Sequence, residues 1–318
     1  MGIVVIGSIN MDLVARTPRL PSPGETITGQ VFETFPEGKV SNQVVACSQL
    51  GANTYMVGRV GDDELDENLK DELEKAGVDH ENVIVDTNTS SGVALIAVED
   101  SAENYIIVIP GANGQVDDQD LKRLEAVLTR SAVLLLQLEI PLKMVMAAAK
   151  LAKEKYVRVI LDPAPTQVLP EEIYPLLDII TPNETETELL VGFSLETKED
   201  IVKAARILSD RGASNAIIKM GGRGAFALMG DQEEFFKPYQ VATVDTVAAG
   251  DAFNGALAVA LSENLPVEKA IQWGMAGGAL SVTKEGAQPA MPERNELKAL
   301  LKNKTDLEYL GDHSDATL

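Results

Sequence analysis

The sequence has little of the chemistry that metal and thiol sites commonly use. It contains one cysteine, Cys47, and two histidines, His80 and His313, among 318 residues. One cysteine excludes an internal disulfide, and these three residues cannot supply a zinc site or a Cys–His nucleophile pair. The chain also lacks a GxSxG elbow, a GxxxxGK[ST] phosphate loop and a GxGxxG motif after its first strand. Any nucleotide site in this protein is therefore built from a different motif.

Basic residues and long apolar runs are also scarce. The chain has 27 Lys and Arg against 49 Asp and Glu, a formal net charge of -22, which disfavours nucleic acid and anionic membranes as partners. No apolar run reaches the ~18 residues of a membrane span, and the N-terminus lacks the basic flank of a signal peptide. We therefore expect a cytoplasmic protein, in which any phosphate site is made locally from backbone N–H groups, a few cations and metal ions.

Short apolar runs alternate with helical patterns through the second half of the chain. Strands are predicted at residues 133–136, 157–161, 179–180 and 216–219, and helices at residues 142–153, 184–191 and 198–211. This alternation, with a first strand at residues 3–6, predicts an α/β fold: a three-layer, doubly wound and mostly parallel sheet. Ligands in such sheets bind beyond the carboxyl ends of the strands. No linker is evident, so we expect a single domain over residues 1–318.

Four early segments with β character do not fit that alternation. They lie at residues 12–16, 25–35, 92–98 and 104–109, and the last two flank a polar turn, which predicts a hairpin. We expect a small antiparallel sheet built from residues 12–36 and 92–110, acting as a lid, a dimerisation surface, or both. The polar residues 303–318 are expected to form a frayed tail.

One segment has the features of an anion site. VDTVAAGDAFNG at residues 244–255 follows a β-like stretch at 239–243 and opens a helix predicted over 249–261. Small residues let a ligand approach the backbone, and the free N–H groups of a first helical turn attract phosphate. Asp251 beside them could take a proton from an attacking hydroxyl. Taken alone, Asp251 is explained at least as well as a helix-dipole partner that contributes at most about 1 kcal/mol.

Three segments together resemble the ribokinase-like carbohydrate kinase family, and the resemblance covers residues 3–301. VDTVAAGDAFNGAL is similar to the family's C-terminal signature, EGKVSNQ at 37–43 to its N-terminal signature, usually GGKGANQ, and TPNETE at 181–186 to its NxxE motif. The resemblance implies ATP-dependent phosphorylation of the primary hydroxyl of a monosaccharide, with D-ribose as the expected substrate. It also implies a homodimer formed through the lid.

The resemblance assigns roles residue by residue. It implies that Asp251 is the general base and that Ala248, Ala249 and Gly250 form the anion hole. The sugar would be bound by Asn10, Asp12, Gly38, Lys39, Asn42, Glu139 and Asp251. ATP, with Mg²⁺ organised through water, would be bound by Asn183, Glu186, Lys219, Gly221, Gly222, Gly224, Ala249 and Gly250. K⁺ would be bound by Asp245 and by backbone carbonyls of Val247, Ser281 and Gly286.

The sugar-side signature departs from the family pattern. Glu37 and Val40 stand where glycine is usual. Valine lacks glycine's access to positive φ and is expected to add bulk beside the sugar, and Glu37 is expected to add a negative charge near Lys39. A shifted sugar, or weak ribose binding, is therefore one hypothesis. The alternatives are a kinase of the same fold for fructose, a nucleoside or an aminosugar, and a non-catalytic sugar or nucleotide sensor. DPAP at 162–165 and GAQP at 286–289 argue against a nucleoside.

Overall fold

The computed structural model describes the backbone of residues 1–101 and 103–311, with the side chains of Glu37 and residues 303–311 outside the described part. Its main sheet has nine strands in the order β13-β12-β11-β10-β9-β8-β1-β4-β5. Neighbouring strands are parallel from β5 across to β11, and β12 is antiparallel to both of its neighbours. The strands are β1 (Gly2–Ile6), β4 (Thr54–Gly61), β5 (Asp79–Asp86), β8 (Ser131–Leu136), β9 (Arg158–Leu161), β10 (Ile179–Ile180), β11 (Asn215–Lys219), β12 (Ala225–Met229) and β13 (Gln232–Phe236).

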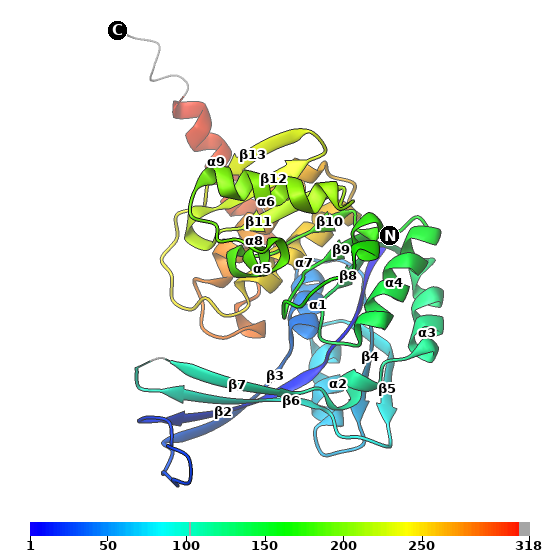
Figure 1. Cartoon of the computed structure of the whole chain (residues 1–318), viewed down its shortest axis with the longest axis vertical. Coiled ribbons are helices and arrows are strands. Elements are labelled where there is room, and N and C mark those ends of the chain that lie inside the picture. The colour runs from blue at the N-terminus through cyan, green and yellow to red at the C-terminus, as the bar shows by residue number, and fades with distance from the viewer. Residues whose placement is uncertain (102, 312–318) are drawn as a thin grey trace.

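Helices cover both faces of this sheet, which confirms the predicted three layers (Figure 1). Along β1, Ile3 and Val5 pack into one apolar core, whereas Val4 and Ile6 pack into the other, because successive side chains of a strand point to opposite faces. The first core is covered by α1 (Lys39–Gln49), α2 (Asp66–Lys75), α7 (Ala249–Ser262), α8 (Val267–Ser281) and α9 (Arg294–Gly311). The second is covered by α3 (Asp118–Leu128), α4 (Leu142–Glu154), α5 (Glu184–Val191) and α6 (Lys198–Asp210). Short 3-10 turns are η1 (Gly111–Gln115), η2 (Glu171–Leu176), η3 (Gly221–Arg223) and η4 (Gln288–Ala290).

A second sheet of four strands projects from the main body (Figure 1). Its order is β3 (Val31–Glu37), β2 (Asn10–Thr17), β6 (Gly92–Glu99) and β7 (Asn104–Ile109). The outer pairs β2–β3 and β6–β7 are antiparallel, and the latter is the predicted hairpin. The central pair β2–β6 is parallel, because its two strands enter from separate connections of the main domain. We call these four strands the small sheet.

Several predicted boundaries differ from the structure. The β segment expected at 25–35 begins only at Val31. The β-like residues 239–243 form no strand and lie along the cavity described below. Of the predicted tail, residues 303–311 continue α9, and residues 312–318 lie outside the described residues.

Small residues let three helices approach closely around the start of α7. A Cβ added at Gly255 of α7 would lie 2.5 Å from the Cβ of Ala46 in α1. A Cβ added at Gly277 of α8 would lie 2.8 Å from the carbonyl oxygen of Ala252. Close packing of this kind leaves no room for side chains between the backbones. It therefore fixes the N-terminal half of α7 against α1 and α8.

Candidate active site

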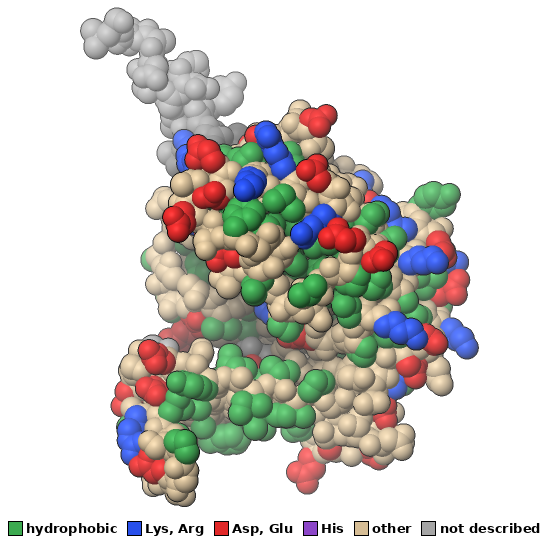
Figure 2. Space-filling model, viewed as in Figure 1, with side chains coloured by type: hydrophobic (Ala, Val, Ile, Leu, Met, Phe, Trp, Pro, Cys, Tyr) green, Lys and Arg blue, Asp and Glu red, His purple; other side chains and the backbone are tan. Residues whose placement is uncertain are grey.

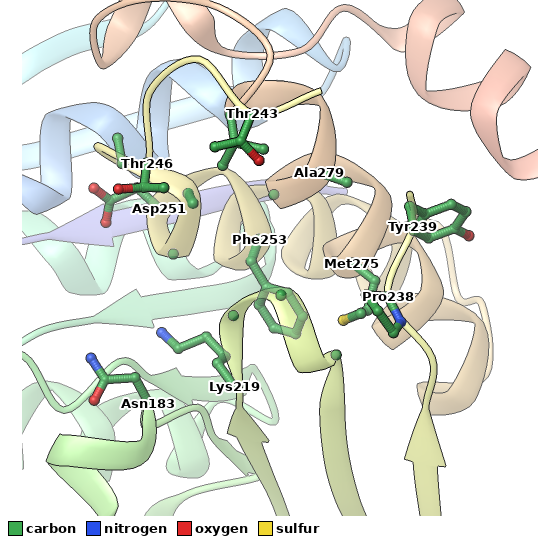
Figure 3. Close-up of a pocket in the computed structure, with 18 of the residues that line it drawn as sticks. Asn183, Lys219, Pro238, Tyr239, Thr243, Thr246, Asp251, Phe253, Met275 and Ala279 are labelled. Carbon is green, nitrogen blue, oxygen red and sulfur yellow. The ribbon is translucent and has the colours of Figure 1, made fainter. Parts of the chain in front are cut away.

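The first turn of α7 forms one wall of a cavity of about 610 Å³ (Figure 3). Ala248 caps the helix in the left-handed region, at φ 57° and ψ 12°, and no side chain caps it. The N–H of Ala252 bonds the Ala248 carbonyl at 2.9 Å, whereas N–H groups earlier in a helix have no helical acceptor. Ala248, Ala249 and Gly250 line the cavity. The structure therefore places all three predicted anion-hole residues at one anion-binding helix terminus.

Asp251 follows at the same terminus and is 5% exposed. Its two carboxylate oxygens accept hydrogen bonds from Asn42 Nδ2 at 3.3 Å and from Gln43 Nε2 at 3.0 Å. Burial raises the pKa of Asp251 to about 6, although the charge of Lys39 and these hydrogen bonds oppose that rise. Asp251 thus combines an accepting carboxylate with a pKa close to neutrality, as a general base requires.

Lys39 and Gly38 lie at the start of α1, opposite Asp251. Gly38 has φ +108°, a conformation that a residue with a side chain rarely adopts, and a Cβ added there would lie 3.2 Å from the backbone nitrogen of Asn10. Burial lowers the pKa of Lys39, but the carboxylates of Asp251, Asp162 and Glu139 outweigh it and hold this pKa above its ordinary value. Lys39 is therefore a permanently charged cation in the cavity.

Glu139 and Asn10 are held from behind by hydrogen bonds. The Ser8 hydroxyl and the backbone N–H of Lys39 both donate to the Glu139 carboxylate, whose pKa is raised chiefly by burial. Asn113 Nδ2 donates to Asn10 Oδ1 at 2.7 Å and to the Ile9 carbonyl at 3.1 Å. Asn113 therefore holds the amide oxygen of Asn10 in place.

The nucleotide side of the cavity is built from the ends of β10 and β11. Asn183 caps α5 by accepting from the Glu186 N–H at 2.8 Å, while Glu186 accepts from the Asn183 N–H at 2.7 Å. This pair is a capping box, and both residues also line the cavity. The pKa of Glu186 is raised by burial, and the charge of Lys219 opposes that rise. Lys219, Gly221, Gly222 and Gly224 line the same wall.

The predicted monovalent cation residues also come together, beside the cavity. The Asp245 carboxylate accepts from the N–H groups of Val247 at 3.0 Å and Gly286 at 3.1 Å. The N–H groups of Val244 and Asp245 bond the Val282 carbonyl, next to Ser281. Within the described residues no group of three His, Cys, Asp or Glu could hold a metal ion. One carboxylate with backbone carbonyls instead suits a monovalent cation.

Several of the predicted sugar-binding residues do not line the cavity. It is lined by Lys39 and Asp251, but not by Asn10, Asp12, Gly38, Asn42 or Glu139. Four of these five connect to it through the contacts given above, whereas Asp12 lies on β2 of the small sheet. Figure 2 shows a hollow between the small sheet and the main body.

The side chain of Val40 does not lie where its position in the sequence predicted. Its side chain is fully buried in the core, where a Cβ added at Gly7 would lie 2.4 Å from Val40 Cγ2. Its φ is negative within helix α1, and the positive φ of this turn belongs to Gly38. The prediction that Val40 adds bulk beside the sugar is therefore wrong. The side chain of Glu37 lies outside the described part.

Some lining residues were not assigned a role from sequence. Asp162 is one of them, although it lies in the DPAP segment and follows a buried strand directly, which in a parallel sheet marks the ligand edge. Gln43, in the EGKVSNQ segment, does not line the cavity but contacts Asp251 and Asp162. The other lining residues come from the loop after β13, from α7 and from α8 with its C-terminal end, which only the tertiary structure brings together. They are Pro238, Tyr239, Gln240, Val241, Thr243, Thr246, Phe253, Met275, Gly278, Ala279 and Val282.

None of the helices in residues 1–101 and 103–311 has the length and apolarity that crossing a bilayer needs.

Comparison with known proteins gives a consistent result. The chain is 39% identical to the ribokinase of Haemophilus influenzae over 301 residues, which cover 95% of this chain and 98% of the relative. It is 36% identical to the deoxyribokinase of Salmonella typhimurium over 302 residues, covering 95% and 99%. The solved structure of Arabidopsis thaliana ribokinase complexed with ribose and ATP matches with a TM-score of 0.88 at 33% identity, covering 95% and 98%.

A family model matches almost the whole described chain. Residues 2–294 match the model of the pfkB family carbohydrate kinases. The matched range contains the α7 terminus, Asp251, Lys39 and the Asn183–Glu186 pair. The chain therefore belongs to the pfkB family of carbohydrate kinases.

Proposed function

We propose that this protein transfers the γ-phosphoryl group of ATP to the primary hydroxyl of D-ribose, giving ribose 5-phosphate and ADP. One observation carries the proposal: the buried Asp251 carboxylate lies both at the anion-binding start of α7 and within hydrogen-bond distance of Asn42. The ribokinase relatives and the ribose-and-ATP complex of a similar structure support the choice of sugar. A consumer of ATP with this fold belongs in the cytoplasm.

The reaction follows from the positions of the chain's own groups. Asp251 takes the proton of the sugar hydroxyl, whose oxygen then forms a bond to the γ-phosphorus as the bond to the β–γ bridging oxygen of ATP breaks. The N–H groups at residues 249–251 stabilise the negative charge spread over the transferring group. Lys39 adds a fixed positive charge on the sugar side of the same cavity.

Two metal ions fit residues already described. Asn183 and Glu186 would hold Mg²⁺ through water, since Mg²⁺ keeps several waters and few direct carboxylates, and it would neutralise charge on the β- and γ-phosphates. Asp245 and the carbonyls of Val247, Ser281 and Gly286 would hold K⁺. The residues that bind it continue directly into Ala248, so the ion would support the shape of the anion hole.

Replacement of Asp251 tests the assignment of the base. Asp251→Asn should lower kcat by roughly 10²–10⁴, the usual contribution of a positioned base, while calorimetry should show that ribose still binds. Kinetics by coupled ADP detection measure the loss. A variant that keeps near-normal turnover would refute the role of Asp251.

The identity of the sugar needs a separate measurement, because one relative at 36% identity is a deoxyribokinase. We expect ribose to give the highest kcat/KM in a panel of ribose, 2-deoxyribose, fructose, an aminosugar and nucleosides, each with and without K⁺. A higher value for 2-deoxyribose would reassign the substrate within the same reaction. Stabilisation against heat by sugar or ATP without any ADP would instead indicate a sensor.

We also propose that two copies pair through the small sheet. Figure 2 shows apolar side chains gathered on this sheet. Phe32 (66% exposed), Ile107 (63%) and Tyr105 (58%) are exposed and share one face of it by register. An exposed apolar surface of this kind marks an interaction site. Ile107→Glu should shift the species seen by light scattering from dimer to monomer, whereas Leu189→Glu, at an exposed leucine of α5, should not. A wild-type protein that is monomeric at micromolar concentration would contradict the proposal.

A further inference from the structure

A chain of buried polar side chains connects the two halves of the cavity. Asp162, directly after β9, is 2% exposed. Its Oδ1 accepts from Lys219 Nζ at 2.9 Å, and its Oδ2 accepts from Gln43 Nε2 at 2.9 Å. The same Gln43 nitrogen donates to Asp251 Oδ1 at 3.0 Å. One amide group thus bridges two carboxylates, one of which carries the Lys219 ammonium.

A second glutamine fixes the direction of this bridge. Gln137 Nε2 donates to Gln43 Oε1 at 2.5 Å, and both glutamines are almost fully buried. Because the oxygen of the Gln43 amide is occupied on that side, its N–H₂ group has to face the carboxylates. The bridge between Asp162 and Asp251 is therefore held in one orientation.

Lys219 extends from the end of β11 to the start of α7. Its backbone N–H bonds the Pro182 carbonyl at 2.8 Å, which anchors the residue beside Asn183. Its ammonium lies 3.4 Å from the position that a Cβ on Gly250 would take. Figure 3 shows Lys219 and Asp251 on facing sides of the same space. The positive charge therefore lies next to the N–H groups of the anion hole.

Stability does not explain an ion pair at this place. The side chains of Lys219 and Asp162 are 14% and 3% exposed, and buried ion pairs often contribute no more stability than apolar residues of equal size. A preorganised cation beside a transferring phosphoryl group, in contrast, stabilises the charge that develops there. The position of the Lys219–Asp162 ion pair is therefore explained by phosphoryl transfer rather than by folding stability.

We propose that Lys219 is a catalytic cation that contacts the transferring phosphoryl group, and that Asp162 is a positioning residue that holds its ammonium beside the anion hole and, through Gln43, orients Asp251. The inference rests on the proposed kinase activity. It adds a connection, through Asp162 and Gln43, between Lys219 beside the phosphoryl group and the base Asp251. Asp162 holds the Lys219 ammonium in position and also neutralises its charge. The free protein therefore contains no unbalanced buried cation.

Kinetics of a double-mutant cycle test the proposal. Lys219→Met should lower kcat by about 10²- to 10³-fold and raise KM for ATP, since one preorganised stabilising group at a transition state contributes roughly that much. Asp162→Asn should lower kcat about tenfold, because its amide cannot hold the ammonium. The double variant should lose less than the product of the two single losses, since Asp162 acts in part through the lysine and in part through Gln43. Losses that multiply, or unchanged kinetics for Lys219→Met, would overturn the proposal.

The pH profile separates positioning from general damage. The charged groups that face Asp251 are Lys39 from α1, Asp162 after β9 and Lys219 from β11, with Glu139 and Glu186 farther along the walls. Asp162→Asn removes a negative charge that raises the pKa of Asp251, so the acidic limb of kcat should move to lower pH. Lys219→Met should not move it in that direction. An acidic limb that stays in place in Asp162→Asn contradicts the link through Gln43.

Binding of MgATP keeps the test independent of the sugar. Calorimetry should show several-fold weaker MgATP binding in Lys219→Met, and no change in Lys150→Met, a matched substitution at an exposed lysine of α4. If wild-type protein turns over no sugar, the proposed function fails while this measurement still decides the role of Lys219. Equal MgATP affinity in wild type and Lys219→Met overturns the inference in either case.

Discussion

Asp251 should lower the free energy of unfolding of the protein, although the proposed activity depends on it. Its pKa is raised from an ordinary value of 3.8 to about 6, chiefly by burial, so the folded state holds the ionised form poorly. A folded-state pKa above the unfolded one means that ionisation opposes folding. The cost grows from about pH 4 to about pH 6 and then stays constant, at about 3 kcal/mol. Replacing the carboxylate by an amide removes this cost.

Asp251→Asn therefore has a pH-dependent effect with a defined sign. Asn42 and Gln43 both donate to the carboxylate, so the amide that replaces it loses one bond, and this fixed penalty does not vary with pH. The ionisation term does vary, by about 1.4 kcal/mol between about pH 5 and about pH 7.5. At about 2–4 °C per kcal/mol, the Tm of the variant relative to wild type should rise by roughly 3–5 °C over that interval.

Thermal unfolding of the ligand-free protein, followed by circular dichroism across this pH range, measures the effect. Asp231→Asn, at an exposed aspartate between β12 and β13, is the matched control and should show no such trend. Stability that rises in the variant while activity is lost would match a site in which burial serves catalysis rather than folding. A Tm difference that is constant with pH, or larger at low pH, would refute the reasoning.

Three further predictions concern groups behind the site. Gly255→Val should cost about 1–3 kcal/mol by overpacking and also lower kcat, because it separates α7 from α1; urea unfolding and ADP assays would show whether both change. Asn113→Ala should raise KM for the sugar while leaving KM for ATP unchanged, since it releases Asn10; an equal change in both constants would count against it. Arg59→Met should cost at most about 3–5 kcal/mol in urea, because it removes one of the two cations that pair with the buried Asp120, at 2.6 Å, and leaves only Arg123. Adding Asp120→Asn should restore part of that loss, and no recovery would show that the ion pair is not the cause.

The central layers and the catalytic helix could be predicted from local sequence. Residues 3–6 are uniformly apolar and form β1, and the small residues at 248–250 followed by Asp251 form the start of α7. These signals are local, so no tertiary information is needed to read them. The edge strand β5 was not predicted, because its residues are only partly buried and show no clear alternation.

The rest of the site depends on contacts between distant segments. Gln43 and Asp162 are 119 residues apart and meet only after α1 packs beside the end of β9. Val40 was misjudged because the pattern shows that glycine is replaced, but not that the side chain points into the core. The parallel β2–β6 pair joins two segments whose partners cannot be told from their own composition.

That parallel pair determines how the small sheet can move. β2 and β6 are paired in register from Asn10 and Gly92 to Thr17 and Glu99, so the two hairpins form one stiff plate instead of two separate arms. Bending is confined to the four short connections that join the plate to the main body. Asn10 is the first residue of β2 and Gly38 directly follows β3, so any tilt of the plate would shift both residues that are proposed to contact the sugar. A second copy that contacts the far edge of the small sheet would therefore also shift the residues at the proposed sugar contacts.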